Sequence, residues 1–269
     1  MDDPILPRPS TTPAAGFERN ATTPPPRGPA TVPAGNGTAW WSEGWRLFAA
    51  APWMWILITV VFCIIMIMLA FVPMLGTLAT TVLAPVLSGG VLSGFRAVDR
   101  GDELTISHLF ASFSDRLAPL IIVGLLYLAG SIVIVAAVAV ALVGAIGMSG
   151  IGALLSGDPL EAGFAFLATF GIGVMLAVLL GLLLGLPLTM AYWFAPALVV
   201  FRNAEPWAAM KSSFDACLVN MMPMLLYSLL GLVFAIGASL PFGLGWLVLL
   251  PVFAGTVYAS YKDIFGDPE

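Results

Sequence analysis

Residues 53–72 read WMWILITVVFCIIMIMLAFV, twenty consecutive positions without a charged side chain. An α-helix rises about 1.5 Å per residue, so this stretch is long enough to cross a hydrocarbon core of about 30 Å. A buried helix of a soluble protein rarely needs so long an uninterrupted apolar run. The segment therefore predicts an all-α integral membrane protein.

The composition of the whole chain agrees with this class. Of the 269 residues, 60% are hydrophobic and 9% are charged, whereas an ordinary soluble domain is about 25% charged. So few charged side chains cannot cover the surface of a soluble fold of this size, so lipid must replace water around much of it. The formal net charge of −5 also argues against nucleic acid as a partner.

Further uncharged stretches bring the expected number of membrane spans to six, arranged as three hairpins. The spans lie near 53–72, 77–95, 119–143, 170–200, 221–240 and 244–261. Turn signals at 73–76 and 241–243 close the first and last hairpins. Asp158-Pro159-Leu160-Glu161 is typical of a helix start, which predicts a short helix on the outer surface before a fourth span kinked at Pro187.

The positions of the basic residues predict the orientation. With six crossings they all fall on one side of the membrane: Arg8, Arg19, Arg27, Arg46, Arg96, Arg100, Arg116, Arg202, Lys211 and Lys262. The connections at 73–76, 144–162 and 241–243 contain none. The positive-inside rule makes the basic side cytoplasmic, so we expect both termini in the cytoplasm.

Residues 1–39 differ from the membrane domain at 40–265. They contain nine of the 21 prolines, including Pro24-Pro25-Pro26, and few large apolar residues. Such a segment buries too little surface to offset its ordering entropy, so we expect a disordered cytoplasmic tail. A proline-rich ligand for the aromatic groove of a partner is the alternative.

Two patterns recur along the chain. PVLSGGVLSGFR at 85–96 aligns without a gap to PVFAGTVYASYK at 251–262, which predicts that the first and last hairpins are an internal repeat.

A short amphipathic stretch precedes each odd-numbered span. Its apolar positions are Trp41, Trp45 and Phe48; then Ile106, Leu109, Phe110, Phe113 and Leu117; then Trp207, Met210, Phe214 and Cys217. We call these stretches elbows and expect them to lie flat at headgroup depth, where they either orient the hairpins or contact lipid and partners.

Residues that carry chemistry are scarce. None of the six spans contains Asp, Glu, Lys, Arg or His, which disfavours ion-coupled transport and intramembrane hydrolysis. The hydroxyls at this depth include Thr59, Thr80, Thr81, Ser88, Ser131, Thr189, Tyr192 and Ser228, and we expect most of them to bond to carbonyls of their own helix. Asp99, Asp102 and Glu103 are interpreted as a solvated turn, and Cys63 and Cys217 as packing residues. We therefore predict no catalytic, cofactor-binding or metal-binding residue.

Small residues four apart allow helices to approach closely. They are Gly90 with Gly94, Gly181 with Gly185, and Gly255 with Ala259. Packing within one chain is the favoured interpretation, and a homo-oligomer is the alternative.

Three stretches carry a family resemblance. They are GWRLF at 44–48, FAPAL at 194–198 with AAMKSSF at 208–214, and GLGWLVL at 243–249 with YASYKDIF at 258–265. Over residues 33–265 the chain resembles an uncharacterised family of proteobacterial multi-pass membrane proteins, whose usual arginine near the end is replaced here by Lys262. The resemblance implies a bacterial inner-membrane location and supplies no activity, ligand or site residue.

Two functions fit these observations. The first is a non-enzymatic membrane component that organises lipid or docks a partner through the elbows and tail. The alternative is a carrier or channel for a neutral or apolar small molecule, built around helices broken at Pro85, Pro187 and Pro196. The alternative predicts a hydrated central cavity lined by residues such as Thr81, Ser88 and Tyr192.

Overall fold

A computed structural model describes residues 28–72, 75–155 and 157–267. All regular secondary structure in these ranges is helical, as the sequence predicts. In chain order the elements are α1 (Asn36–Ala50), α2 (Pro52–Ala70), α3 (Leu75–Asp99), the 3-10 helix η1 (Ile106–Phe110), α4 (Ser112–Asp115), α5 (Leu117–Leu155), α6 (Pro159–Trp193), α7 (Ala195–Arg202), α8 (Pro206–Val219), α9 (Met221–Ser239) and α10 (Trp246–Phe265).

Five segments of the described chain are long and apolar enough to cross a membrane, where the sequence predicts six. They are α2, α3, α5, α6 together with α7, and α9. The sixth expected span, 244–261, forms α10, which is long enough but less apolar. Contacts with α1, α2, α3 and α9 enclose α10, and its buried residues include Thr256, Ser260 and Tyr261. A helix covered by protein can contain such polar side chains.

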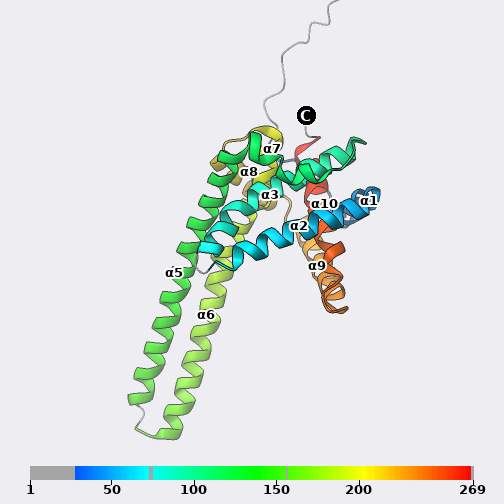
Figure 1. Cartoon of the computed structure of the whole chain (residues 1–269). Helices are drawn as coiled ribbons and strands as arrows, with labels where there is room; N and C mark the ends of the chain where they lie inside the picture. The colour runs from blue at the N-terminus through cyan, green and yellow to red at the C-terminus, as the bar shows by residue number, and fades with distance from the viewer. Residues whose placement is uncertain (1–27, 73–74, 156, 268–269) are drawn as a thin grey trace, which may run out of the picture.

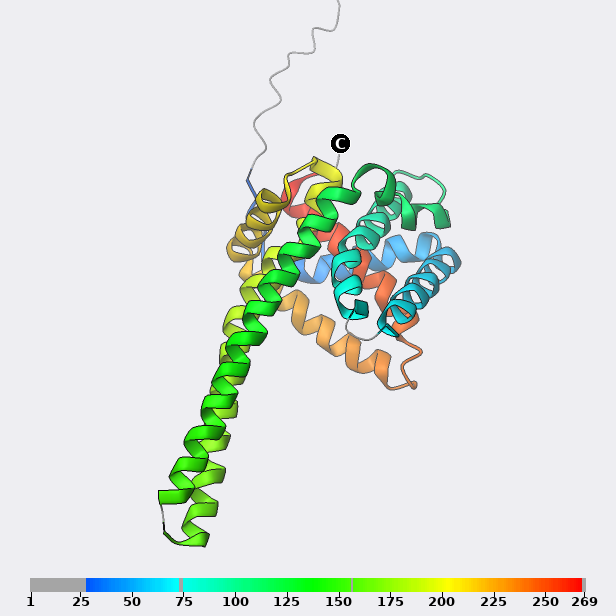
Figure 2. The same cartoon turned by 60° about the vertical axis from the view of Figure 1, so that its left-hand side comes forward.

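The α5–α6 hairpin extends far beyond the other helices (Figures 1 and 2). Because α5 has 39 residues, it is about 58 Å long, well over the thickness of a hydrocarbon core. The expected surface helix before the fourth span is therefore wrong, because α6 runs without interruption from Pro159. The Asp158 side chain caps α6 as predicted by accepting a hydrogen bond from the Leu160 amide at 2.8 Å.

The fourth expected span contains a break in its helix. Pro187 lies inside α6, which continues past it, and helix geometry is broken at Phe194, two residues before Pro196, between α6 and α7. Ser213 of α8 bonds to both sides of this break: its hydroxyl donates to the Met190 carbonyl at 2.6 Å and accepts from the Phe194 amide at 2.9 Å. A hydroxyl from a neighbouring helix thus satisfies backbone groups that a break would leave unpaired.

Ordered structure begins before the expected end of the tail at residue 39. The Ala30 amide donates to the Ile264 carbonyl at 2.9 Å, and the Val32 amide donates to the Asn220 side chain at 2.8 Å. Helix α1 then starts at Asn36. These long-range bonds, which no local pattern reveals, fix residues 30–39 to the helices, while residues 1–27 lie outside the described chain.

Helix α1 crosses α10 at very short range. A Cβ atom added to Gly44 would lie 2.7–2.8 Å from atoms of Thr256 and Val252, and one added to Gly255 would lie 3.1 Å from the Gly44 backbone. Two glycines therefore let the two helices pack with their backbones in contact.

We predict that Gly44→Ala lowers the free energy of unfolding by about 1–3 kcal/mol, because the added methyl group has no space. Gly185→Ala is the matched control, since nothing lies within 4 Å of a Cβ at that helical position. Thermal unfolding of both variants in detergent checks this. Equal midpoints for the two would contradict the close packing of α1 on α10.

Candidate functional site

The three elbows form helices that are fixed to the bundle on one side and exposed on the other. They are α1, η1 with α4, and α8. Buried elbow residues include Phe48, Leu109 and Met210, whereas exposed aromatic residues are Trp45, Phe110, Phe113 and Trp207. Each elbow packs on a helix that ends a hairpin: α1 on α10, η1 on α3, and α8 on α6 and α7.

The tryptophans of the first elbow have different environments, which their shared helical spacing does not reveal. Trp41 is buried; its ring stacks on Tyr227 with centroids 5.3 Å apart, and its indole N–H donates to the Tyr227 carbonyl at 3.1 Å. Trp45 is 54% exposed. Trp41 therefore belongs to the protein core rather than to a headgroup layer.

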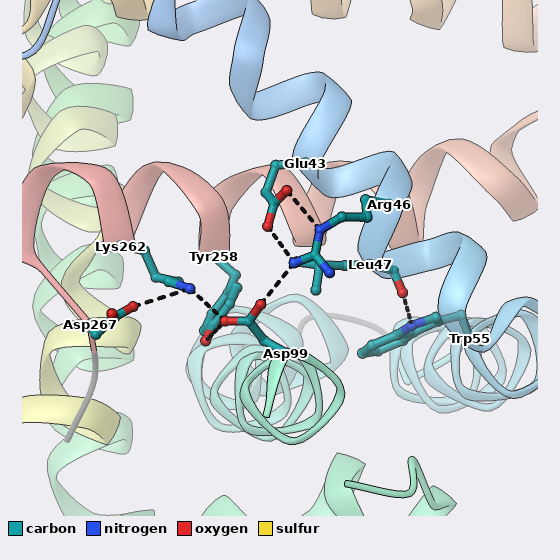
Figure 3. Close-up of polar contacts among 8 residues, drawn as sticks. All are labelled: Glu43, Arg46, Leu47, Trp55, Asp99, Tyr258, Lys262 and Asp267. Carbon is teal, nitrogen blue, oxygen red and sulfur yellow. Dashed lines mark hydrogen bonds and ion pairs between the residues drawn. The ribbon is translucent and has the colours of Figure 1, made fainter. Parts of the chain in front are cut away.

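An ionic network centred on Asp99 joins the end of α3 to α1 and α10 (Figure 3). The Asp99 carboxylate accepts from Arg46 at 2.8 Å, from Lys262 at 2.6 Å and from the Tyr258 hydroxyl at 3.1 Å. Its side chain is 13% exposed. Asp99 therefore does not belong to a freely solvated turn, as the sequence suggests, but holds three helices together.

The cations of this network stay charged. Hydrogen bonding to Glu43 raises the pKa of Arg46, and Asp99 raises it further against the effect of burial. Burial alone would lower the pKa of Lys262, but hydrogen bonds to Asp99 and Asp267 raise it overall. Each charge is thus matched by an opposite one, an arrangement typical of a structural clamp.

A second clamp fastens the start of α1 to the end of α10. One carboxylate oxygen of Asp263 accepts from the Trp40 indole at 2.8 Å and from the Asn36 side chain at 2.7 Å. Together with Asp99, it ties the N-terminal elbow to the C-terminal helix over more than 200 residues of sequence. Sequence reasoning missed both pairings because neither has a local signature.

The remaining candidate chemical groups lie apart from one another. Within the described ranges no three His, Cys, Asp or Glu residues are close enough to hold a metal ion. The Nδ1 atom of His108 lies 3.2 Å from the Thr105 amide in a capping box that begins η1. Cys217 is buried and packs in the core, as predicted, and this burial raises the pKa of its thiol to about 12. Cys63 is half-buried.

The hydroxyls within the apolar helices bond as predicted to carbonyls of their own helix. The donors are Thr59, Thr80, Thr81, Ser88, Ser131, Thr189 and Ser228, at 2.8–3.1 Å. Tyr192 packs its ring against Tyr127 with centroids 4.7 Å apart. The seven serine and threonine hydroxyls are thus satisfied within their own helices.

The small residues pack largely within the chain. A side chain at Gly90 would collide with the Leu109 carbonyl, and one at Gly94 would meet Leu104 and Trp55. Gly255 faces Gly44, as described above. At Gly185 a Cβ would meet open space, so this position is not used for packing in the described chain.

Comparison with known proteins supports the membrane location. The chain is 28% identical over 266 aligned positions to a probable inner membrane protein of Burkholderia thailandensis, and the alignment covers 88% of this chain and 94% of the relative. No protein-family model and no solved structure matches it. Because the described ranges contain five candidate spans, the chain is a multi-pass inner-membrane protein.

We predict that Asp99→Asn lowers the free energy of unfolding by about 1–2 kcal/mol. Hydrogen bonds to charged groups are worth more than this when buried, but Arg46 is half exposed and screened. Denaturant unfolding followed by tryptophan fluorescence provides the measurement. Glu103→Gln, which removes an exposed carboxylate four residues away, is the control and should change little.

A double-mutant cycle sharpens this test. Asp99→Asn combined with Lys262→Met should cost less than the sum of the single changes, because the two residues interact directly. Strict additivity, or an Asp99→Asn protein as stable as the parent, would contradict the clamp.

Proposed function

We propose that this inner-membrane protein is a non-enzymatic component that organises lipid or docks a partner through its elbows. The observation that carries this proposal is the exposure of Trp45, at 54%, and of Trp207, at 69%, on helices whose other faces are buried. Exposed tryptophans near charged residues are typical of headgroup depth and of docking surfaces. Because the elbows are held by the bundle, binding there requires little ordering of the protein.

The proposed topology has six spans, with α10 as the sixth and both termini in the cytoplasm. The contacts among basic residues support it. Arg46 and Lys262 share Asp99, Arg116 donates to Asn203, and Arg202 donates to the Phe265 carbonyl. Cations from two connections and from the segments before the first span and after the last thus gather at one end of the helices, which the positive-inside rule assigns to the cytoplasm.

The absence of enzymatic activity is also a proposal. It is supported by the hydrogen bonding of two carboxylates: Asp99 accepts from three donors, and Asp263 from two. General acids and bases need a proton-transfer partner within reach of a substrate. Carboxylates that accept hydrogen bonds from neighbouring helices in this way suit a structural role better.

The proposed internal repeat relates α2–α3 to α9–α10. Aligned residues in the two return helices have matching environments: Pro85 and Pro251 are buried within their helices, and Phe95 and Tyr261 are fully buried. Gly89 and Gly255 both lie where another element approaches within 3.1 Å of an added Cβ. An elbow covers each return helix, η1 on α3 and α1 on α10.

The carrier or channel alternative is less well supported. It requires polar groups that face a central cavity, but Thr81 and Ser88 are engaged with their own helix. The structure contains a polar cavity beside Arg96, an apolar groove beside Trp41 and a groove beside Thr189. None of these three is lined by Thr81, Ser88 or Tyr192.

The orientation is tested by cysteine labelling. In a background with Cys63→Ala and Cys217→Ala, we expect Glu161→Cys to react with a membrane-impermeant maleimide in intact spheroplasts, and Glu103→Cys to react only after lysis. Both side chains are exposed in the structure. Reporter fusions that show the side of the membrane on which each terminus lies then distinguish six spans from five. Five spans would place the two termini on opposite sides of the membrane. Labelling of position 103 in intact spheroplasts would overturn the orientation.

The elbow function is tested with Trp45→Ala combined with Trp207→Ala in the full chain. Covering one tryptophan contributes roughly 1–3 kcal/mol, so the double change should weaken lipid or partner retention by about tenfold or more. The readouts are phospholipid phosphorus per protein and the cross-linked proteins after purification in mild detergent.

The matched control for this experiment removes similar exposed aromatic area elsewhere. Phe71→Ala with Phe164→Ala serves, because these residues are 80% and 67% exposed and lie outside the elbows. The same lipid and protein content in the elbow variant, the control and the parent would refute the proposal. Trp41 is left unchanged, because it is buried and its replacement would lower lipid or partner binding by disturbing the core.

A further inference from the structure

A polar cavity of about 470 Å³ lies where the end of α3, the η1–α4 elbow and α7 meet. Its charged and polar walls are Arg96 from α3, Arg100 just after α3, His108 from η1, Ser112 from α4, and Arg116 just before α5, with Asp102 and Asp115 also present. Three guanidinium groups therefore share one cavity at the end of the apolar part of α3.

The charges are unevenly distributed over this cavity. Arg96, His108 and Arg116 are half-buried, whereas Asp102 and Asp115 are exposed, as is Arg100. The less exposed charged side chains of the lining are therefore those of Arg96 and Arg116, and the carboxylates are more exposed to solvent. A negatively charged group beside Arg96 and Arg116 is attracted by both.

The inner arginines are held in place by neighbouring residues. The Arg96 guanidinium lies over the Phe201 ring, 5.1 Å from its centroid, and Arg116 donates to the Asn203 side chain. Arg96 and Arg100 are one helical turn apart, a spacing at which like charges destabilise each other. An anion beside these residues would be attracted by both, and Arg96 and Arg116 are already positioned near it.

An unpaired hydroxyl gives a second, independent sign of a ligand. Ser112 lines the cavity and is 3% exposed, and its Oγ has no hydrogen-bond partner among the described residues. A buried hydroxyl without a partner costs free energy, so such groups are rare unless something absent from the protein binds them.

We propose that this cavity binds a phosphate group through Arg96, Arg100 and Arg116, with Ser112 donating to a phosphate oxygen. The planar fork of arginine matches phosphate oxygens two at a time, and basic pockets at the cytoplasmic ends of membrane helices suit anionic headgroups. The phosphate belongs to an anionic phospholipid or to a soluble phosphate. The inference rests on the proposed lipid function where the phosphate is that of a phospholipid headgroup.

The experiment measures binding to the full chain in a neutral detergent. Native mass spectrometry counts added phosphatidylglycerol, with phosphatidylcholine as the zwitterionic comparison, and thermal shifts report binding of inorganic phosphate. The variants are Arg96→Gln, Arg116→Gln and Ser112→Ala. Lys211→Gln is the matched control, because it removes an exposed positive charge on α8, outside the cavity.

We expect the wild type to prefer phosphatidylglycerol over phosphatidylcholine, each arginine variant to lose about tenfold in affinity, and Lys211→Gln to retain it. Ser112→Ala should also bind more weakly while folding normally, so it remains informative if an arginine variant misfolds. A matching loss for inorganic phosphate identifies a soluble phosphate as a ligand, whereas a loss confined to phosphatidylglycerol identifies the lipid.

The proposed phosphate site would be overturned if the cavity variants bound phosphatidylglycerol and inorganic phosphate as tightly as Lys211→Gln does. That result is distinct from failure of the elbow function. Lipid retention that depends on Trp45 and Trp207 but not on Arg96 or Arg116 would leave the proposed function standing and remove the cavity from it.

Discussion

The close approach of each elbow to a helix that ends a hairpin is the constraint on which the rest of the structure depends. Backbones can come this near only where side chains are small or can bond to the facing chain. Gly44 meets Gly255 between α1 and α10, and Gly90 faces the Leu109 carbonyl between α3 and η1. Between α8 and α6 the close approach is made by Ser213, whose hydroxyl bonds to the backbone where the helix is broken at Phe194.

These contacts join α1, the first described helix, to α10, the last, and place α10 at the centre of the helix bundle. The first elbow rests on the last helix, and the ionic network at Asp99 and the bonds to Asp263 reinforce that contact where charges are tolerated. Because charged groups are costly among apolar helices, they are confined to the helix ends. Glycine contacts therefore bring the helices together, and ion pairs fix them at the polar end.

The sequence predicts the elements well and their environments poorly. A charge-free run of twenty residues has few alternatives to a helix in lipid, which explains why α2 and α9 lie within two residues of the expected spans. The glycine-rich stretch at 144–155 is part of α5, because glycine is well tolerated in membrane helices. The burial of Trp41 and the exposure of Trp45 depend on α9 and α10, and the partners of Asp99 lie 53 and 163 positions away, distances that no periodicity encodes.

The packing constraint also accounts for the polar cavity. A side chain at Gly89 would lie 2.7 Å from the Ser112 hydroxyl, and one at Gly90 would collide with the backbone of η1. The two adjacent glycines therefore allow the second elbow to settle against α3, which carries His108 and Ser112 to the same side as Arg96. Larger residues at 89 and 90 would push η1 and α4 outward and open this wall. The contact that sets the position of the elbow thus also forms the cationic cavity, which connects the fold to the proposed recognition of phosphate.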